Sequence, residues 1–112
     1  MAIGNDRLYQ SVQAILFGEG DMRSRVVVAC HILRKMSAIE IDMSLRKRLD
    51  LVLIDASTKR SILDANGNVL NGYDTYTETA KGRRNSTYVK LAKEIYAIYL
   101  DDLAIKKPKG GK

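Results

Sequence analysis

A run of positive charge near the C-terminal end of the chain is its most unusual chemical feature. Five cations and three small polar residues occur there with no acid among them: Lys81, Arg83, Arg84, Asn85, Ser86, Thr87, Lys90 and Lys93. We call this set the basic rim. It flanks the expected start of a helix, where unpaired backbone N–H groups already favour negative charge. Such a site suits a phosphate, above all that of nucleic acid, or an acidic side chain. The alternative is a solvated loop whose arginines pair with Asp74 or Glu78.

The remaining reactive side chains form no catalytic or metal-binding set. Residues 64–68 have the first ligand spacings of a calcium-binding loop, but Val69 occupies the position that requires glycine, so a turn built by Asx side chains explains them better. Cys30 and His31 are adjacent, and neighbours on a helix point about 100° apart, so they cannot act as nucleophile and base. One cysteine and one histidine do not make a zinc site. We therefore expect no metal, no cofactor and no enzymatic activity.

One arginine is expected inside the molecule. Arg25 lies on the apolar side of its predicted helix, whereas Arg23 and Arg34 face water. A partly buried guanidinium needs carboxylates or backbone carbonyls around it. We expect Arg25 to be structural and to form an ion pair with Glu19, Asp50 or Asp55.

The net charge of +6 is concentrated in the last residues of the chain. Four lysines lie in residues 106–112, so only two of the six net charges belong to the rest of the sequence. Pro108 and the two glycines of this segment do not support a helix. We therefore expect one helical domain over residues 1–105 and a disordered basic tail over residues 106–112.

Length and composition favour a single domain in a reducing compartment. A chain of 112 residues with 46% apolar content can bury a core. Cys30 alone cannot form an intramolecular disulfide, and the N-terminus does not resemble a signal peptide, so a cytoplasmic location is expected. No apolar run approaches the roughly 18 residues that span a membrane, so we expect no membrane partner.

Hydrophobic periodicity predicts four main helices, over residues 5–18, 21–36, 44–60 and 86–105. Asp21 is expected to cap the second and Asp42 or Ser44 the third, while Val28 and Ile32 widen the buried side of the second. Residues 62–76 are rich in turn-forming dipeptides and form either a small β-hairpin or an irregular loop. Residues 75–81 add one or two helical turns. The expected fold is all-α, an antiparallel bundle of four main helices with a turn-rich insertion and the last helix at its centre.

Two predicted helices carry more apolar residues than one core-facing side requires. In the third helix, Leu51 and Ile54 lie opposite the core stripe, so we expect them to be exposed in a monomer. In the last helix, Leu91, Ile98 and Ile105 recur every seven residues beside the main apolar face. These five residues form two candidate seams for contact with a partner.

Two motifs resemble those of small, functionally uncharacterised bacterial helical proteins. The first is a Gly-Glu-Gly turn, residues 18–20, before a helix that bears Arg23 and Arg25; the second is a basic, Thr-containing segment, residues 84–87, that opens the C-terminal helix. The resemblance covers about half the chain. It implies a bacterial, cytoplasmic protein and brings no activity, cofactor or partner with it.

The sequence therefore suggests a binding protein rather than an enzyme. We expect a small regulatory or interaction protein that forms a homo-oligomer, or binds another protein, through the two apolar seams. The alternative is a protein that binds DNA or RNA phosphates through the basic rim without reading the bases.

Overall fold

The computed structural model describes residues 6–36 and 41–106, so the expected tail lies outside the described residues except for Lys106. These residues form five helices and no strand: α1 (Asp6–Phe17), α2 (Met22–Leu33), α3 (Met43–Asp55), α4 (Thr75–Lys81) and α5 (Asn85–Lys106). The all-α class is confirmed, and the turns expected at residues 75–81 are α4.

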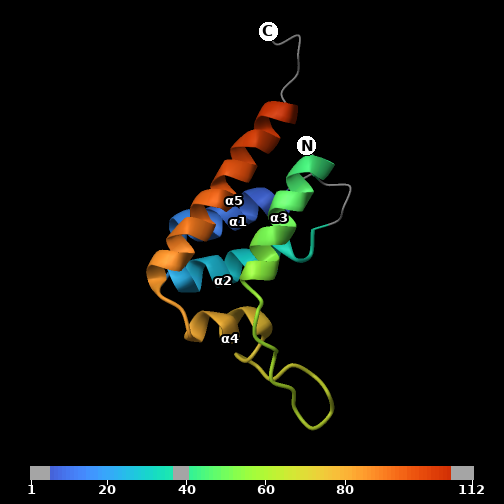
Figure 1. The fold of residues 1–112 in the computed structure, drawn as a ribbon, viewed down its shortest axis with the longest axis vertical. Coiled ribbons are helices and arrows are strands. Elements are labelled where there is room, and N and C mark those ends of the chain that lie inside the picture. The colour runs from blue at the N-terminus through green and yellow to red at the C-terminus, as the bar shows by residue number, and fades with distance from the viewer. Residues whose placement is uncertain (1–5, 37–40, 107–112) are drawn as a thin grey trace.

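The helices are arranged in two crossing pairs rather than one bundle. Helices α1 and α2 pack side by side, and Figure 1 shows them crossing behind α3 and α5 at a steep angle. Helix α5 packs against α1, α2 and α3, as expected for the central element. The predicted antiparallel bundle of four main helices is not confirmed, because two of those helices run across the other two.

Three aspartates cap helices in the described chain. Asp21 accepts the Ser24 N–H at the start of α2, and Asp42 accepts the Ser44 N–H at the start of α3, as predicted. The N–H bond from Ser24 lowers the pKa of Asp21, and the hydroxyl of Ser44, together with its N–H, lowers the pKa of Asp42. Asp74 accepts the N–H groups of the first turn of α4. Between α1 and α2 the chain turns at Gly20, whose φ of 91° strongly favours glycine.

Helix α3 ends at Asp55, five residues earlier than predicted. The following backbone bonds to α4 instead of continuing the helix. The Thr75 hydroxyl donates to the Lys59 carbonyl, and the Thr79 hydroxyl accepts the Lys59 N–H at 2.9 Å. Tertiary hydrogen bonds therefore satisfy backbone groups that a longer helix would have paired internally.

The core contains the predicted apolar stripes of α2 and α3. From these helices it takes Val26, Ala29, Leu33, Leu45, Leu49 and Val52, and from α5 it takes Tyr88, Leu91, Ala92, Ile95 and Ile98. Cys30 is a buried core residue, as expected, and burial raises the pKa of its thiol to about 12. The expectation for Val28 is wrong: it is 51% exposed, because it borders an open hollow between α2 and the α1 residues Arg7 and Gln10.

One candidate seam is largely internal. Leu91 and Ile98 are buried beneath the neighbouring helices, so they are not available to a partner in this fold. Sequence periodicity alone did not reveal that α5 is covered by three helices on that side. Leu51, Ile54 and Ile105 are exposed, which keeps them as candidate contacts.

The insertion between α3 and α4 projects from the helical body as a loop (Figure 1). A single antiparallel bridge joins Leu63 to Val69, so the predicted hairpin is not confirmed. Asp64 Oδ1 accepts the N–H groups of Asn66 and Asn68, which is the Asx-type turn expected from the sequence.

Candidate functional site

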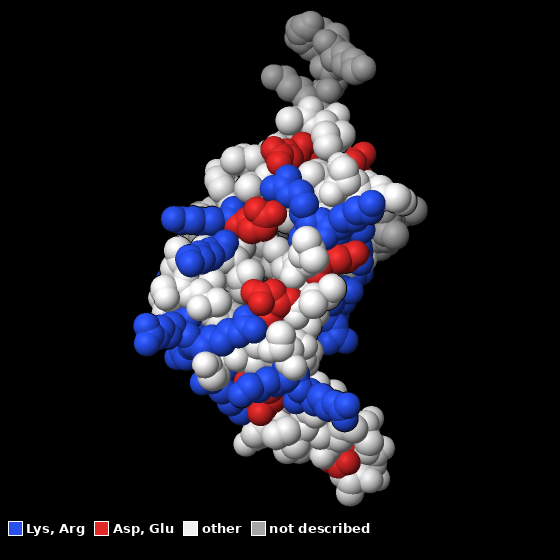
Figure 2. Space-filling model, in the orientation of Figure 1, with Lys and Arg blue, Asp and Glu red and all other residues white. Residues whose placement is uncertain are grey.

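The basic rim lies at the junction of α2, α4 and α5. Lys81 ends α4, Arg83 and Arg84 lie in the connection, and the other members belong to the first half of α5. Figure 2 shows lysine and arginine side chains gathered over this half of α5 and over the junction with α4. The structure therefore places the predicted rim residues on neighbouring parts of the surface.

Two cations that the sequence did not assign to the rim join it in space. Arg23 of α2 donates from Nη1 to the carbonyl oxygen of Arg83 at 2.8 Å. The Nζ atom of Lys59 lies beside Gly82, because a β-carbon at position 82 would be only 3.2 Å from it. Both residues are distant from the rim in sequence, so no local pattern could have identified them. The resemblance had pointed to Arg23, but without this role.

Two rim cations have partners within the protein. Lys81 Nζ lies 2.5 Å from Glu78 Oε2 and 4.2 Å from the centre of the Tyr73 ring. Arg83 Nη1 lies 3.5 Å from Asp55 Oδ2, and Arg83 Nη2 donates to the Thr58 hydroxyl at 3.3 Å. These two residues hold α3, α4 and the connection together, so their charge is partly compensated.

Three rim cations point into solvent. Arg84, Lys90 and Lys93 are exposed, and none of them makes an ion pair with another described residue. Arg84 directly precedes α5 and Lys90 and Lys93 lie in its first half, so three uncompensated positive charges fall within ten residues of the chain. This is the part of the rim that remains available to an external anion.

Asn85 caps α2 rather than its own helix, α5. The helix already includes Asn85, and the Asn85 Oδ1 atom accepts the backbone N–H of Arg23 at 3.0 Å. Together with Asp21, Asn85 therefore caps α2. Ser86 is exposed in the same first turn of α5, and Thr87 donates its N–H to the Arg84 carbonyl at 3.1 Å.

Arg25 is structural, as expected, but its partners are carbonyl groups. Its Nε donates to the Gly20 carbonyl at 3.1 Å, and its Nη1 donates to the Ile15 carbonyl at 3.3 Å. The last carbonyls of α1 lack hydrogen-bond partners within the helix and carry the negative end of its dipole. A guanidinium at this position donates to these carbonyls and its positive charge interacts favourably with the dipole. No ion pair with Glu19, Asp50 or Asp55 forms within the described chain.

His31 and Asp74 form a second polar contact that sequence analysis missed. His31 Nε2 lies 2.9 Å from Asp74 Oδ2, and the His31 ring meets the Tyr76 ring edge-on at 5.3 Å between centroids. Burial alone would raise the pKa of Asp74, but hydrogen bonds from Thr77 and the charge of His31 outweigh it and lower that pKa. The contact joins α2 to the start of α4.

The hydroxyl group that contacts this pair is that of Thr77, which donates to Asp74 Oδ1 at 2.6 Å, and Cys30 is buried in the core. Among residues 6–36 and 41–106, no three His, Cys, Asp or Glu side chains are grouped so that they could hold a metal ion.

The second half of α5 carries an exposed apolar surface. Tyr96, Leu100 and Leu103 follow one another at helical spacing on one side of α5, and they are 46%, 45% and 47% exposed. Tyr99 lies beside them, with its ring 6.3 Å from that of Tyr96 and 6.1 Å from that of Tyr9 in α1. We call these five residues the apolar stripe.

An acid is buried on another side of the same helix segment. Asp102 is 0% exposed, whereas its neighbour Asp101 is exposed and lies 2.6 Å from Arg48 Nη1. The second half of α5 therefore buries a carboxyl group while it exposes leucine and tyrosine side chains. Helical spacing separates the two, because Asp101 lies seven residues after Glu94 on the polar side, whereas Asp102 lies four residues after the buried Ile98.

Compared with models of known protein families, with curated proteins and with solved structures, the chain matches none. None of the helices in the described residues has the length and apolar content needed to span a membrane.

Proposed function

We propose that this protein is a non-enzymatic interaction protein that self-associates through the apolar stripe of α5 and α1. The observation that carries the proposal is the exposure of Tyr96, Leu100 and Leu103, each close to half exposed on one helix side. Isolated exposed apolar residues are normal, but a contiguous set marks a surface that gains free energy when another surface covers it.

The shape of the stripe favours a second copy of the chain as the partner. Leu100 lies between Tyr96 and Leu103, so two α5 helices related by a two-fold axis near Leu100 would place leucine against leucine and tyrosine against leucine. Such a pairing is self-complementary. The stripe contains no charged side chain, so the pairing brings no like charges of the stripe together. Tyrosines at its edges keep their hydroxyl groups in water while their rings are covered.

Multi-angle light scattering over a concentration series tests this proposal. A mass near twice 12.5 kDa is expected for the natural chain. The variant Leu100→Asp should return the mass to that of a monomer while the helical circular dichroism stays unchanged, because Leu100 is not part of the monomer core.

Leu51→Asp is the matched control, since Leu51 is an exposed leucine on α3 outside the stripe. It should leave the dimer intact. A monomeric natural protein at all concentrations, or a dimer that dissociates with Leu51→Asp but not with Leu100→Asp, contradicts the proposal.

A second candidate function is the binding of nucleic-acid phosphates by the basic rim. Its specific support is the set Arg84, Lys90 and Lys93, three exposed cations without ion pairs among the described residues. A duplex or single strand presents phosphates at regular spacing, and each neutralised phosphate releases counterions, so binding weakens as salt rises. The rim offers no arrangement that would read base edges.

Fluorescence anisotropy with labelled duplex DNA and single-stranded RNA across a salt series tests this second candidate. The slope of log K against log[salt] is negative, and the triple variant Arg84→Gln, Lys90→Gln, Lys93→Gln should reduce its magnitude by about 2 to 3. The control variant Arg34→Gln, Lys35→Gln, Lys47→Gln removes the same charge elsewhere and should preserve most binding. Loss of binding only on deletion of residues 106–112 contradicts a role for the rim.

A further inference from the structure

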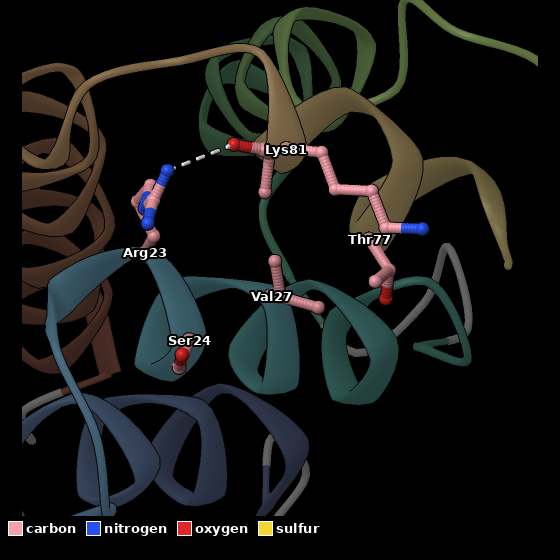
Figure 3. A pocket seen from close by; sticks show the side chains of 6 residues that line it. Arg23, Ser24, Val27, Thr77 and Lys81 are labelled. Atoms are coloured by element: carbon pink, nitrogen blue, oxygen red, sulfur yellow. Dashed lines mark hydrogen bonds between the residues drawn. The ribbon is translucent and has the colours of Figure 1, made fainter. Parts of the chain in front are cut away.

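A cleft lies between α2 and α4, next to the rim but outside the apolar stripe. Its walls are Arg23, Ser24 and Val27 from α2 and Thr77, Ala80 and Lys81 from α4. Its volume is about 460 Å³, within the range of about 300 to 1,000 Å³ that is typical of small-molecule sites. Figure 3 shows Arg23 at one end of the cleft and Thr77 at the other, with Val27 between them.

From this arrangement we propose that the cleft binds a small organic anion, in which one carboxylate or phosphate is attached to a compact apolar body. The anionic group would contact Arg23, and the apolar body would lie on Val27 and Ala80. Neither proposed function above is required for this inference.

Arg23 is held in position for an anion. Its Nη1 donates to the carbonyl oxygens of Arg83 at 2.8 Å and Ala80 at 3.4 Å, and its Nε lies 3.5 Å from Asp21. Within the described chain no acceptor faces Nη2, while the side chain is still more than one-third exposed. A guanidinium fixed on one side by carbonyls presents its remaining N–H groups to a ligand without a large loss of side-chain entropy.

Lys81 contributes less charge to the cleft than its position suggests. Its ammonium group is paired with Glu78 and stands over the Tyr73 ring. Figure 3 shows the side chain extended past Thr77, so its methylene groups rather than its amine border the cleft. A single anionic group at Arg23 therefore matches the site better than a ligand with charges at both ends.

The rest of the cleft selects for an apolar body with a polar far end. Val27 and Ala80 are the apolar residues of the wall, and Figure 3 shows Val27 between Arg23 and Thr77. The Thr77 hydroxyl donates its proton to Asp74 Oδ1 at 2.6 Å, so its oxygen is left as an acceptor for a ligand donor. A bound ligand would contact both α2 and α4 and would stabilise their packing by mass action.

Nuclear magnetic resonance titration of the whole ¹⁵N-labelled chain tests the proposal with three probes: benzoate, phenyl phosphate and inorganic phosphate. Benzoate or phenyl phosphate should cause saturable shifts centred on the amides of Ser24, Val27, Thr77 and Ala80. Whichever of the two binds more tightly identifies the anionic group. Inorganic phosphate, which lacks the apolar body, should bind at least tenfold more weakly.

Two variants separate the cleft from general charge attraction. Arg23→Met removes the guanidinium and Val27→Phe fills the cleft, and each should weaken binding of the better probe at least tenfold. Arg34→Met, on the same helix but outside the cleft, should leave it unchanged. If Arg23→Met does not fold, Val27→Phe alone decides. Shifts that do not saturate, that spread to Lys90 and Lys93, or that persist in Val27→Phe overturn the proposal.

Discussion

The second half of α5 is richer in apolar residues than the first, with eight in residues 96–106 against five in residues 85–95, yet it exposes more of them. In the first half, Tyr88, Ala92 and Ile95 are buried while Lys90 and Lys93 are exposed, as in a helix at the edge of a core. In the second half, Tyr96, Leu100 and Leu103 are exposed while Asp102 is completely buried. The helix continues without interruption from one half to the other.

The difference between the halves arises from their neighbours rather than from the helix itself. Helices α1 and α2 cross α5 near its first half and middle (Figure 1), so side chains there meet a core. Past this crossing, one side of α5 has no helix opposite it. The comparison teaches that an amphipathic pattern specifies which residues can be buried, whereas the length of the crossing helices determines which ones are.

The largest expected effect is that of Ile95→Ala. Ile95 is 0% exposed, so its truncation removes buried methyl groups and leaves a cavity, and it should lower the free energy of unfolding by about 2 to 5 kcal/mol. Urea denaturation in dilute solution measures this change. An effect below about 1 kcal/mol would mean that the first half of α5 is not part of the core.

Asp74→Ala should have the next largest effect, because α4 leads directly into the first half of α5. The variant removes a helix cap and the contact with His31, so unfolding should become easier by about 1 to 2 kcal/mol near neutral pH. The folded pKa of Asp74 is below its ordinary value of 3.8. The stability that the carboxylate contributes is therefore present above that value and is lost as pH falls through the folded pKa.

Urea denaturation at neutral and acidic pH checks this dependence. The difference between Asp74→Ala and the natural protein should shrink on acidification. A difference that stays constant below pH 3.8 would show that the carboxylate charge is not involved.

Arg48→Met should have a smaller effect that involves both halves. Arg48 of α3 lies 3.0 Å from Glu94 in the first half of α5 and 2.6 Å from Asp101 in the second. Because all three side chains are partly exposed, the expected loss is about 0.2 to 1 kcal/mol, and it should decrease at high salt. Thermal unfolding at low and high ionic strength measures it, and a loss unaffected by salt would point to packing instead.

The smallest expected effect on monomer stability is that of Leu100→Ala. Because Leu100 is already half exposed, the change should stay within about 0.5 kcal/mol when the protein is dilute enough to be monomeric. At high concentration the variant should lose the additional stability that self-association gives the natural chain. Urea denaturation at two protein concentrations measures both values, and a large loss in dilute solution would place Leu100 in the monomer core.

Sequence alone predicted the local features of this protein. The helical class, the cap Asp21, the restriction of the next cap to Asp42 or Ser44 and the exposure of Leu51 and Ile54 were all predictable. Each of them depends on residues a few positions apart in the chain, where propensity, capping chemistry and helical period act directly.

The tertiary structure alone decided which distant groups meet. It placed Arg23 and Lys59 beside the rim, directed Asn85 to cap α2, paired His31 with Asp74 and buried Leu91, Ile98 and Asp102 while exposing Leu100 and Leu103. These outcomes depend on the angle at which α1 and α2 cross α5 and on where that crossing ends. The crossing angle is set by the packing of side chains from several helices at once, so no single segment of sequence contains it.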